Sequence, residues 1–152
     1  MSCFPTRRLF LAVLLGVLSQ CAHAQDSPTV FPVQKLNAGI LVIQAEVAST
    51  DPQREQGLMF RPTLGESQGM AFVFDFPARE CMWMKNTLLP LSVAFLDETG
   101  TIVNIEDMQP QTLTDHCSTR PVLYALEMNL GWFAKHGLKA GSKISGFRPL
   151  SH

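Results

Sequence analysis

The sequence predicts a β-rich α+β domain, built as a small closed or nearly closed β-barrel with two short helices. Its apolar segments are short and alternate with a period of two, and glycine, proline and polar residues separate them at close intervals. Only two segments carry helix-start signals. The 152 residues suffice for one domain with one hydrophobic core.

The first 24 residues have the pattern of a signal peptide. Two arginines precede an apolar run over residues 9–18, which at about ten residues is too short to span a bilayer as a helix. Alanines at the −3 and −1 positions suit cleavage after Ala24. A lipoprotein modified at Cys21 is the alternative, although Gln20 fits poorly in front of a lipidated cysteine.

Processing after Ala24 would leave a polar, flexible leader over residues 25–34 and a single domain over residues 35–152. The protein is then expected in the periplasm or outside the cell, with no membrane span. Once two arginines leave with the signal, ten basic residues face thirteen acidic ones. We therefore expect no nucleic-acid partner, because such binding depends on neutralising phosphates.

The first predicted strand covers residues 39–48, which alternate with a period of two. A short helix to about residue 59 follows, and it has two possible starts. Either Thr50 caps it with Gln53 reaching back, or Asp51 caps it with Pro52 at the first helical position.

The rest of the chain reads as short strands and one more helix. Residues 69–76 place their aromatic side chains on one face, which we expect to be buried. Asn129 is expected to cap the second helix. The remaining predicted elements are strands at 80–84, 91–97, 101–107, 122–128 and 143–147, a hairpin turn at 98–100, a loop at 107–121 and a helix at 130–136. The alternation predicts buried Phe72, Phe74, Val93 and Phe95, and exposed Glu98, Lys139 and Lys143.

Two cysteines, Cys81 and Cys117, remain after processing. In an oxidising compartment two cysteines of a small domain usually pair, so we predict a disulfide between them. Free thiols and metal ligation are the alternatives.

Three motifs together resemble a known family. They are "REQGLMFR" at residues 54–61, "CMWMKNTLLPL" at 81–91 and "YALEMNLGWFAKHGLKAG" at 124–141. In this order they resemble the bacterial and archaeal family called domain of unknown function 192, over about residues 35–147. The resemblance implies a small, mainly β fold, and it implies no particular reaction and no cofactor.

The first two motifs contain the candidate ligand site. They place rigid donors beside large apolar groups, which suits an anionic or polyhydroxylated small molecule if the two segments converge on one cleft. The residues expected there are Arg54, Arg61, Trp83, Lys85 and Asn86. In the structural alternative, Arg54 or Lys85 pairs with Glu127, and Asn86 caps a turn.

The sequence supports a metal site and a catalytic site less well than the ligand site. Thiolate, thioether and imidazole ligands favour Cu(I), and the candidate set is Cys81, Met84, His116 and Cys117. No catalytic residues are predicted, because the sequence has no G-x-S-x-G or H-E-x-x-H motif and no glycine-rich phosphate loop. Paired carboxylates could act as acid and base, but those near the hairpin are expected to be solvated: Asp97, Glu98, Glu106 and Asp107. Cys117 beside His116 could be a nucleophile, but a disulfide would leave it without a reactive thiol.

The sequence therefore predicts a small-ligand-binding or accessory module with an unidentified small molecule as its partner. A hydrolase-like enzyme using the same cleft and a copper-handling protein are the alternatives. A cleft that gathers the five predicted site residues without a general base would favour binding, whereas a histidine or a carboxylate in that cleft would favour an enzyme.

Overall fold

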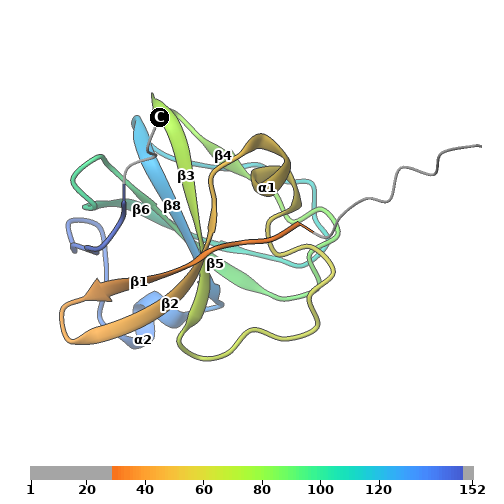
Figure 1. The fold of residues 1–152 in the computed structure, drawn as a ribbon, viewed down its shortest axis with the longest axis horizontal. Coiled ribbons are helices and arrows are strands. Elements are labelled where there is room, and N and C mark those ends of the chain that lie inside the picture. The colour runs from red at the N-terminus through yellow and green to blue at the C-terminus, as the bar shows by residue number, and fades with distance from the viewer. Residues whose placement is uncertain (1–28, 149–152) are drawn as a thin grey trace, which may run out of the picture.

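The computed structural model describes residues 29–148 (Figure 1). The predicted signal peptide, its cleavage after Ala24, the lipoprotein alternative at Cys21 and most of the predicted leader lie outside the described residues. Within 29–148, neither helix is long and apolar enough to cross a membrane.

The domain is β-rich, with a six-stranded sheet in the order β1-β2-β3-β8-β5-β6 and a two-stranded sheet of β4 and β7. Neighbouring strands are antiparallel except β2 and β3, which are parallel and connected through α1. The elements are β1 (Val33–Ala38), β2 (Leu41–Ala48), α1 (Asp51–Gln56), β3 (Gln68–Ala78), β4 (Cys81–Met82), β5 (Leu91–Leu96), β6 (Ile102–Met108), β7 (His116–Cys117), β8 (Val122–Asn129) and α2 (Trp132–Lys135).

The predicted closure into a barrel is not confirmed, because the six-stranded sheet is open and β1 and β6 are its edges in the described chain. The predicted last strand at 143–147 is reduced to two isolated bridges, Asn37 to Ser145 and Thr101 to Lys143. Gly141 and Gly146 adopt φ angles of 89° and 103° on either side of these bridges. Both values lie outside the extended region, so the segment does not form a continuous strand.

The sheet begins earlier than the sequence suggested. β1 starts at Val33, inside the predicted leader, and pairs with β2 around a turn at Gly39, whose φ is 62°. In β1 only Leu36 and Ala38 are buried. An edge strand that buries so little has a weak apolar pattern, which explains why it was missed.

The two helices differ in how well they were predicted. The capping box of Thr50 and Gln53 is confirmed, with Pro52 in the first turn of α1. The expected cap of the second helix is wrong: α2 starts after Gly131, which has no side chain to cap it. Asn129 instead donates its amide to the carbonyls of Leu64 and Gly65, both at 3.1 Å.

Both faces of the sheet are buried, so simple alternation fails in β3. Ala71 and Val73 are buried on one face and Phe72 on the other. The pairing of β3 with β8 shifts between Val73 and Ala78, and beyond Val73 the strand leaves the core. Phe76 is therefore 69% exposed, against expectation. Phe72, Val93 and Phe95 are buried as predicted, Phe74 is half-buried, and Glu98, Lys139 and Lys143 are exposed.

Candidate functional site

A groove of about 340 Å³ lies between α1, the outer end of β3 and β4, which meet near the top of Figure 1. We call it the acidic groove. Its apolar lining consists of Phe72, Phe74, Phe76, Cys81, Met82 and Trp83, and its charged lining of Asp51, Arg54, Glu55, Asp75 and Glu80. The outer end of β3, where its pairing with β8 shifts, supplies Phe74 and Phe76 to the lining.

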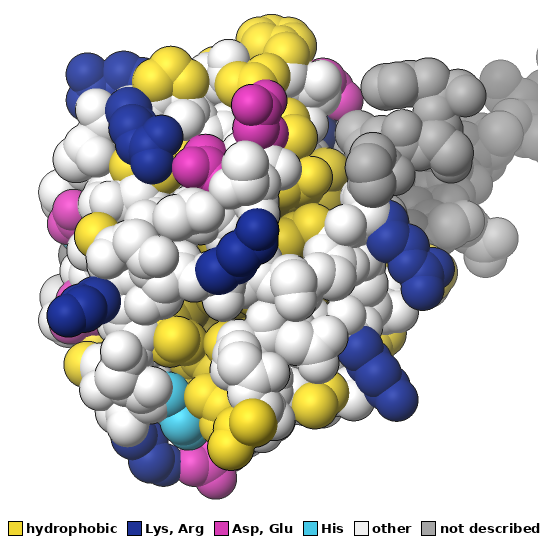
Figure 2. All heavy atoms as spheres, turned by 90° about the vertical axis from the view of Figure 1, so that its left-hand side faces the viewer, with side chains coloured by type: hydrophobic (Ala, Val, Ile, Leu, Met, Phe, Trp, Pro, Cys, Tyr) yellow, Lys and Arg dark blue, Asp and Glu magenta, His cyan; other side chains and the backbone are white. Residues whose placement is uncertain are grey.

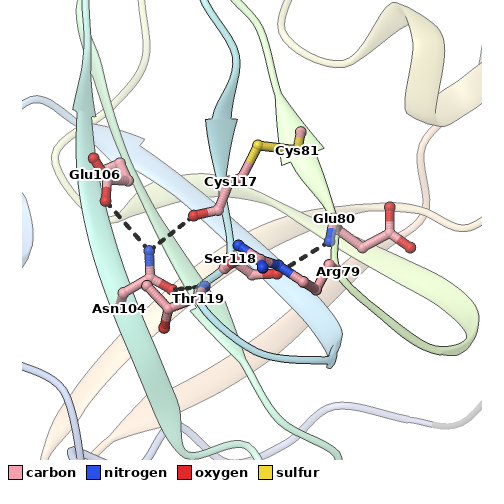
Figure 3. Close-up of a disulfide and its surroundings, with 8 residues drawn as sticks. All are labelled: Arg79, Glu80, Cys81, Asn104, Glu106, Cys117, Ser118 and Thr119. Carbon is pink, nitrogen blue, oxygen red and sulfur yellow. Dashed lines mark hydrogen bonds between the residues drawn. A yellow bond between two sulfur atoms is a disulfide. The ribbon is translucent and has the colours of Figure 1, made fainter.

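The predicted disulfide is present and holds one wall of the groove. Cys81 and Cys117 face each other across β4 and β7, with Cα atoms 4.0 Å apart and an S–S bond of 2.04 Å. Figure 3 shows the hydrogen bonds around it. Asn104 donates to the Cys117 carbonyl at 3.1 Å, and the Glu80 N–H donates to Ser118 Oγ at 3.0 Å. β4 is therefore tied to β6 and β7 on both sides of the disulfide.

Arg54, the expected ligand-binding cation, is used to hold the fold. Its Nη1 donates to the carbonyls of Ser49 and Val73, both at 2.8 Å. Its Nη2 pairs with Asp51 and, at 3.2 Å, with Asp75. The side chain is 15% exposed. The guanidinium thus joins α1 to the ends of β2 and β3, and each of its two Nη atoms already has two partners.

The groove holds four carboxylates against this one guanidinium. Asp51 and Asp75 share Arg54, whereas Glu55 is exposed and has no hydrogen bond or ion pair with any described residue. Burial raises the pKa of Glu80, and Arg54 opposes the shift. In Figure 3 the Glu80 carboxylate points away from Ser118. The lining is therefore aromatic and negatively charged.

A smaller cavity of about 20 Å³ adjoins the groove, and we call it the inner cavity. Arg54, Glu55, Phe72, Met82 and Trp83 line both spaces. The further residues that line the inner cavity are Gln56, Gly57, Leu58, Met59, Thr87 and Glu127.

Glu127 is 4% exposed, and its carboxyl makes no hydrogen bond or ion pair within the described chain. The pairing with Arg54 or Lys85 that the sequence suggested is not formed. Burial raises the pKa of Glu127 to about 8, because a carboxylate without a partner is costly in an apolar surrounding.

Lys85 and Asn86 lie outside the acidic groove. They line a second open hollow of about 680 Å³ together with Met59 and Phe60, and it shares Glu55 and Trp83 with the groove. Lys85 Nζ stands 5.2 Å from the centre of the Trp83 ring, within cation–π range. Asn86 has a φ of 55°, and its backbone carbonyl accepts a hydrogen bond from the N–H of Phe60 at 2.9 Å.

Arg61 lines neither the groove nor this hollow. It forms a two-pronged ion pair with Glu46, at 2.7 and 2.5 Å, and its guanidinium lies 5.7 Å from the centre of the Phe31 ring. The hydrogen bonds that Arg61 donates to Glu46 raise the pKa of Arg61. The predicted five-residue cleft is thus divided: Arg54 and Trp83 line the groove, Trp83 also lines the hollow of Lys85 and Asn86, and Arg61 pairs with Glu46 of β2.

Sequence reasoning missed the acidic lining. It gave Asp51 only a possible role as a helix cap, and it gave no role to Glu55, Asp75 or Glu80. One signal was available: Phe74 and Phe76 flank Asp75 just before Pro77 ends the alternating pattern. Such a strand end carries more aromatic surface than its partner strand can cover.

The residues of the catalytic and copper alternatives lie elsewhere. Neither described histidine, His116 nor His136, lines the groove. The His136 ring packs 4.3 Å from that of Trp132. In the disulfide, Cys81 and Cys117 offer no thiolate, and Met84 is fully buried. Residues 29–148 contain no group of three or more His, Cys, Asp or Glu side chains placed to hold a metal.

The model of the family DUF192, described as an uncharacterized ACR, matches residues 33–146. Two crystal structures are similar. One is a proposed transcription regulator from Sinorhizobium meliloti 1021, with 33% identity and a TM-score of 0.75, covering 79% of this chain and 98% of the other. The second is a protein of unknown function from Novosphingobium aromaticivorans DSM 12444, with 31% identity and a TM-score of 0.72, covering 80% and 94%. No curated protein matches.

Proposed function

The chain belongs to the DUF192 family, and we propose that it is a small-ligand-binding or accessory module whose acidic groove binds an organic cation. One observation carries this proposal: four aromatic side chains and four carboxylates line one groove, while its single guanidinium is bound internally. Aromatic faces attract cations, and a cleft lined by one sign of charge concentrates ions of the other sign.

The acidic lining changes the ligand that the sequence suggested. An anion in the groove would lie beside the carboxylates of Asp75, Glu55 and Glu80, which repel a like charge. Both Nη atoms of Arg54 already have partners within the protein. A polyhydroxylated ligand could still donate to the carboxylates. The aromatic lining favours a ligand with an apolar body and a positive charge.

We place the protein in the periplasm or outside the cell. The signal-peptide pattern of residues 1–24 and the disulfide of Cys81 with Cys117 support this location, because structural disulfides persist in oxidising compartments. Fusing residues 1–34 to a reporter enzyme that is active only after export tests it. Activity that stays in the cytoplasm would contradict the location.

Binding can be tested with three six-carbon probes that differ in charge: hexyltrimethylammonium, hexan-1-ol and hexanoate. We expect the cation to raise the melting temperature and to alter Trp83 fluorescence, since the second tryptophan, Trp132, is buried on the other face of the sheet. A probe at about 100 times its dissociation constant stabilises by ~2.7 kcal/mol. Equal effects of cation and anion would refute the proposal.

A pair of matched variants localises the effect. Glu55 and Glu98 are both exposed and make no hydrogen bond with any described residue, so Glu55→Gln and Glu98→Gln remove the same charge from different places. Only Glu55→Gln, in the groove, should weaken binding of hexyltrimethylammonium, and raised salt should weaken it in the parent protein. An equal loss in both variants would point to general electrostatic attraction.

Hydrolysis in the same groove is the second candidate, favoured by Glu80, whose pKa burial raises and which shares the groove with three other carboxylates. Two carboxyl groups with separated pKa values can act as acid and base. Turnover of 4-nitrophenyl glycosides or esters that Glu80→Gln abolishes would support it. Turnover unaffected by this variant would rule out Glu80 as the acid.

The name of the Sinorhizobium relative raises the question of DNA binding, which we do not propose. The chain has 12 basic and 13 acidic residues. On the face that carries the β1–β2 turn, basic side chains stand apart with uncharged and acidic groups between them (Figure 2). A nucleic-acid surface usually gathers its basic residues.

A further inference from the structure

The buried carboxyl of Glu127 lies beneath the proposed binding groove. Glu127 pairs across the sheet with Met70 of β3 and Val93 of β5, and directly paired residues in antiparallel strands point to the same face. Met70 and Val93 pack in the cluster that also contains Leu58 and Phe72. The Glu127 side chain therefore points to the side of the sheet that carries α1 and the groove.

The inner cavity is lined by Glu127 and by five residues that also line the groove. Its volume of about 20 Å³ is enough for one water-sized group and no more. The titratable side chains that line it besides Glu127 are Arg54 and Glu55 of α1. The neighbours on β3 and β5 are apolar, and Arg54 already binds two carbonyls and two carboxylates.

We propose that Glu127 anchors the primary ammonium group of an alkylamine or arylamine, with the apolar body of the ligand lying in the acidic groove between Phe74, Phe76 and Trp83. This inference rests on the proposed function and narrows its ligand from organic cations to primary amines. The size of the inner cavity sets the selectivity, because a protonated primary amine fits a water-sized space and a trimethylammonium group does not.

Binding should release a proton. Glu127, whose pKa burial raises to about 8, is mostly protonated at pH 7. The incoming ammonium keeps its own proton, since alkylamines titrate near pH ~10. Its positive charge favours the carboxylate, so the Glu127 proton passes to the solvent and leaves an ammonium–carboxylate pair. The exchange is one cation bound for up to one proton released.

Hexylamine and hexyltrimethylammonium are the probes for this inference, titrated calorimetrically at pH 7 in two buffers with different ionisation enthalpies. We expect hexylamine to bind about tenfold more tightly or better, the effect of one charge-assisted hydrogen bond, and to release about one proton. The trimethyl compound should release none. Glu127→Gln should reduce hexylamine affinity about tenfold and abolish proton release, while Glu98→Gln changes neither.

The outcomes separate the two proposals. If both cations bind equally and release no proton, the groove binds cations and the Glu127 anchor is overturned. If neither binds better than hexan-1-ol, the proposed function fails and the anchor with it. A preference for hexylamine that survives Glu127→Gln also overturns the anchor. Should this variant not fold, selectivity and proton release in the parent protein decide the question, since neither needs a variant.

Discussion

Arg54 and Glu127 line the same inner cavity but do not pair. The guanidinium is held by Asp51 and Asp75 at the surface and by two backbone carbonyls. Glu127 stays buried without a partner in the described chain, which native proteins usually avoid unless the group has a use. This arrangement is the basis of the proposed amine site.

Glu127 should make stability fall with pH. Its pKa of about 8 in the folded protein lies above the ordinary glutamate value of 4.5, so the folded state binds more protons than the unfolded state between these values. The free energy of unfolding then decreases as pH rises from about 4.5 to 8, by at most ~1.4 kcal/mol per pH unit. Urea unfolding of the parent protein and of Glu127→Gln at several pH values checks this. Parallel curves for both proteins would contradict it.

Removing the disulfide should destabilise the domain substantially. Cys81 and Cys117 are 36 residues apart, and closing a loop of that length stabilises by ~3 to 4 kcal/mol in the chain-entropy model. The Cys81→Ser/Cys117→Ser double variant should lose that much in urea unfolding, and a reducing agent should affect only the parent protein. Two free thiols per unfolded, non-reduced chain would show that the disulfide does not form.

The two arginines of the first sequence motif should contribute unequally. Arg54→Met leaves two carbonyls and Asp75 without their donor, so we expect a loss of ~2 to 4 kcal/mol. Arg61→Met removes a half-exposed ion pair with Glu46, so we expect the free energy of unfolding to fall by ~1 kcal/mol or less. Unfolding free energies of both variants test the order, and equal losses would contradict the structural role of Arg54.

Two phenylalanines of β3 should separate stability from binding. Phe72→Ala removes a buried ring and should cost ~3 to 5 kcal/mol. Phe76 is 69% exposed in the groove, so Phe76→Ala should change stability by ~0.5 kcal/mol or less and weaken binding of hexyltrimethylammonium. A large stability loss in Phe76→Ala would show that its ring belongs to the core.

Much of the local structure could be predicted from the sequence. The helix start at Thr50, the turn between β5 and β6, strand β8 and the pairing of Cys81 with Cys117 all appear as predicted. Capping and turn geometry depend on residues within about four positions, and residues 29–148 contain two cysteines, so each has one possible partner there. The motifs also identified the family.

Only the tertiary structure decided which charges meet. Along the chain, Arg54 is 19 residues from Val73 and 73 residues from Glu127. These three residues come together through the parallel pairing of β2 with β3 and the antiparallel pairing of β3 with β8. The shift in β3 that exposes Phe76 also arises from this pairing. Strand register is set by packing over the whole sheet, because a slip of one residue would turn every side chain to the other face. No local pattern around Arg54 or Glu127 could therefore show that the guanidinium would bind two carbonyls and two carboxylates, while the buried carboxyl would have no hydrogen-bond partner in the described chain.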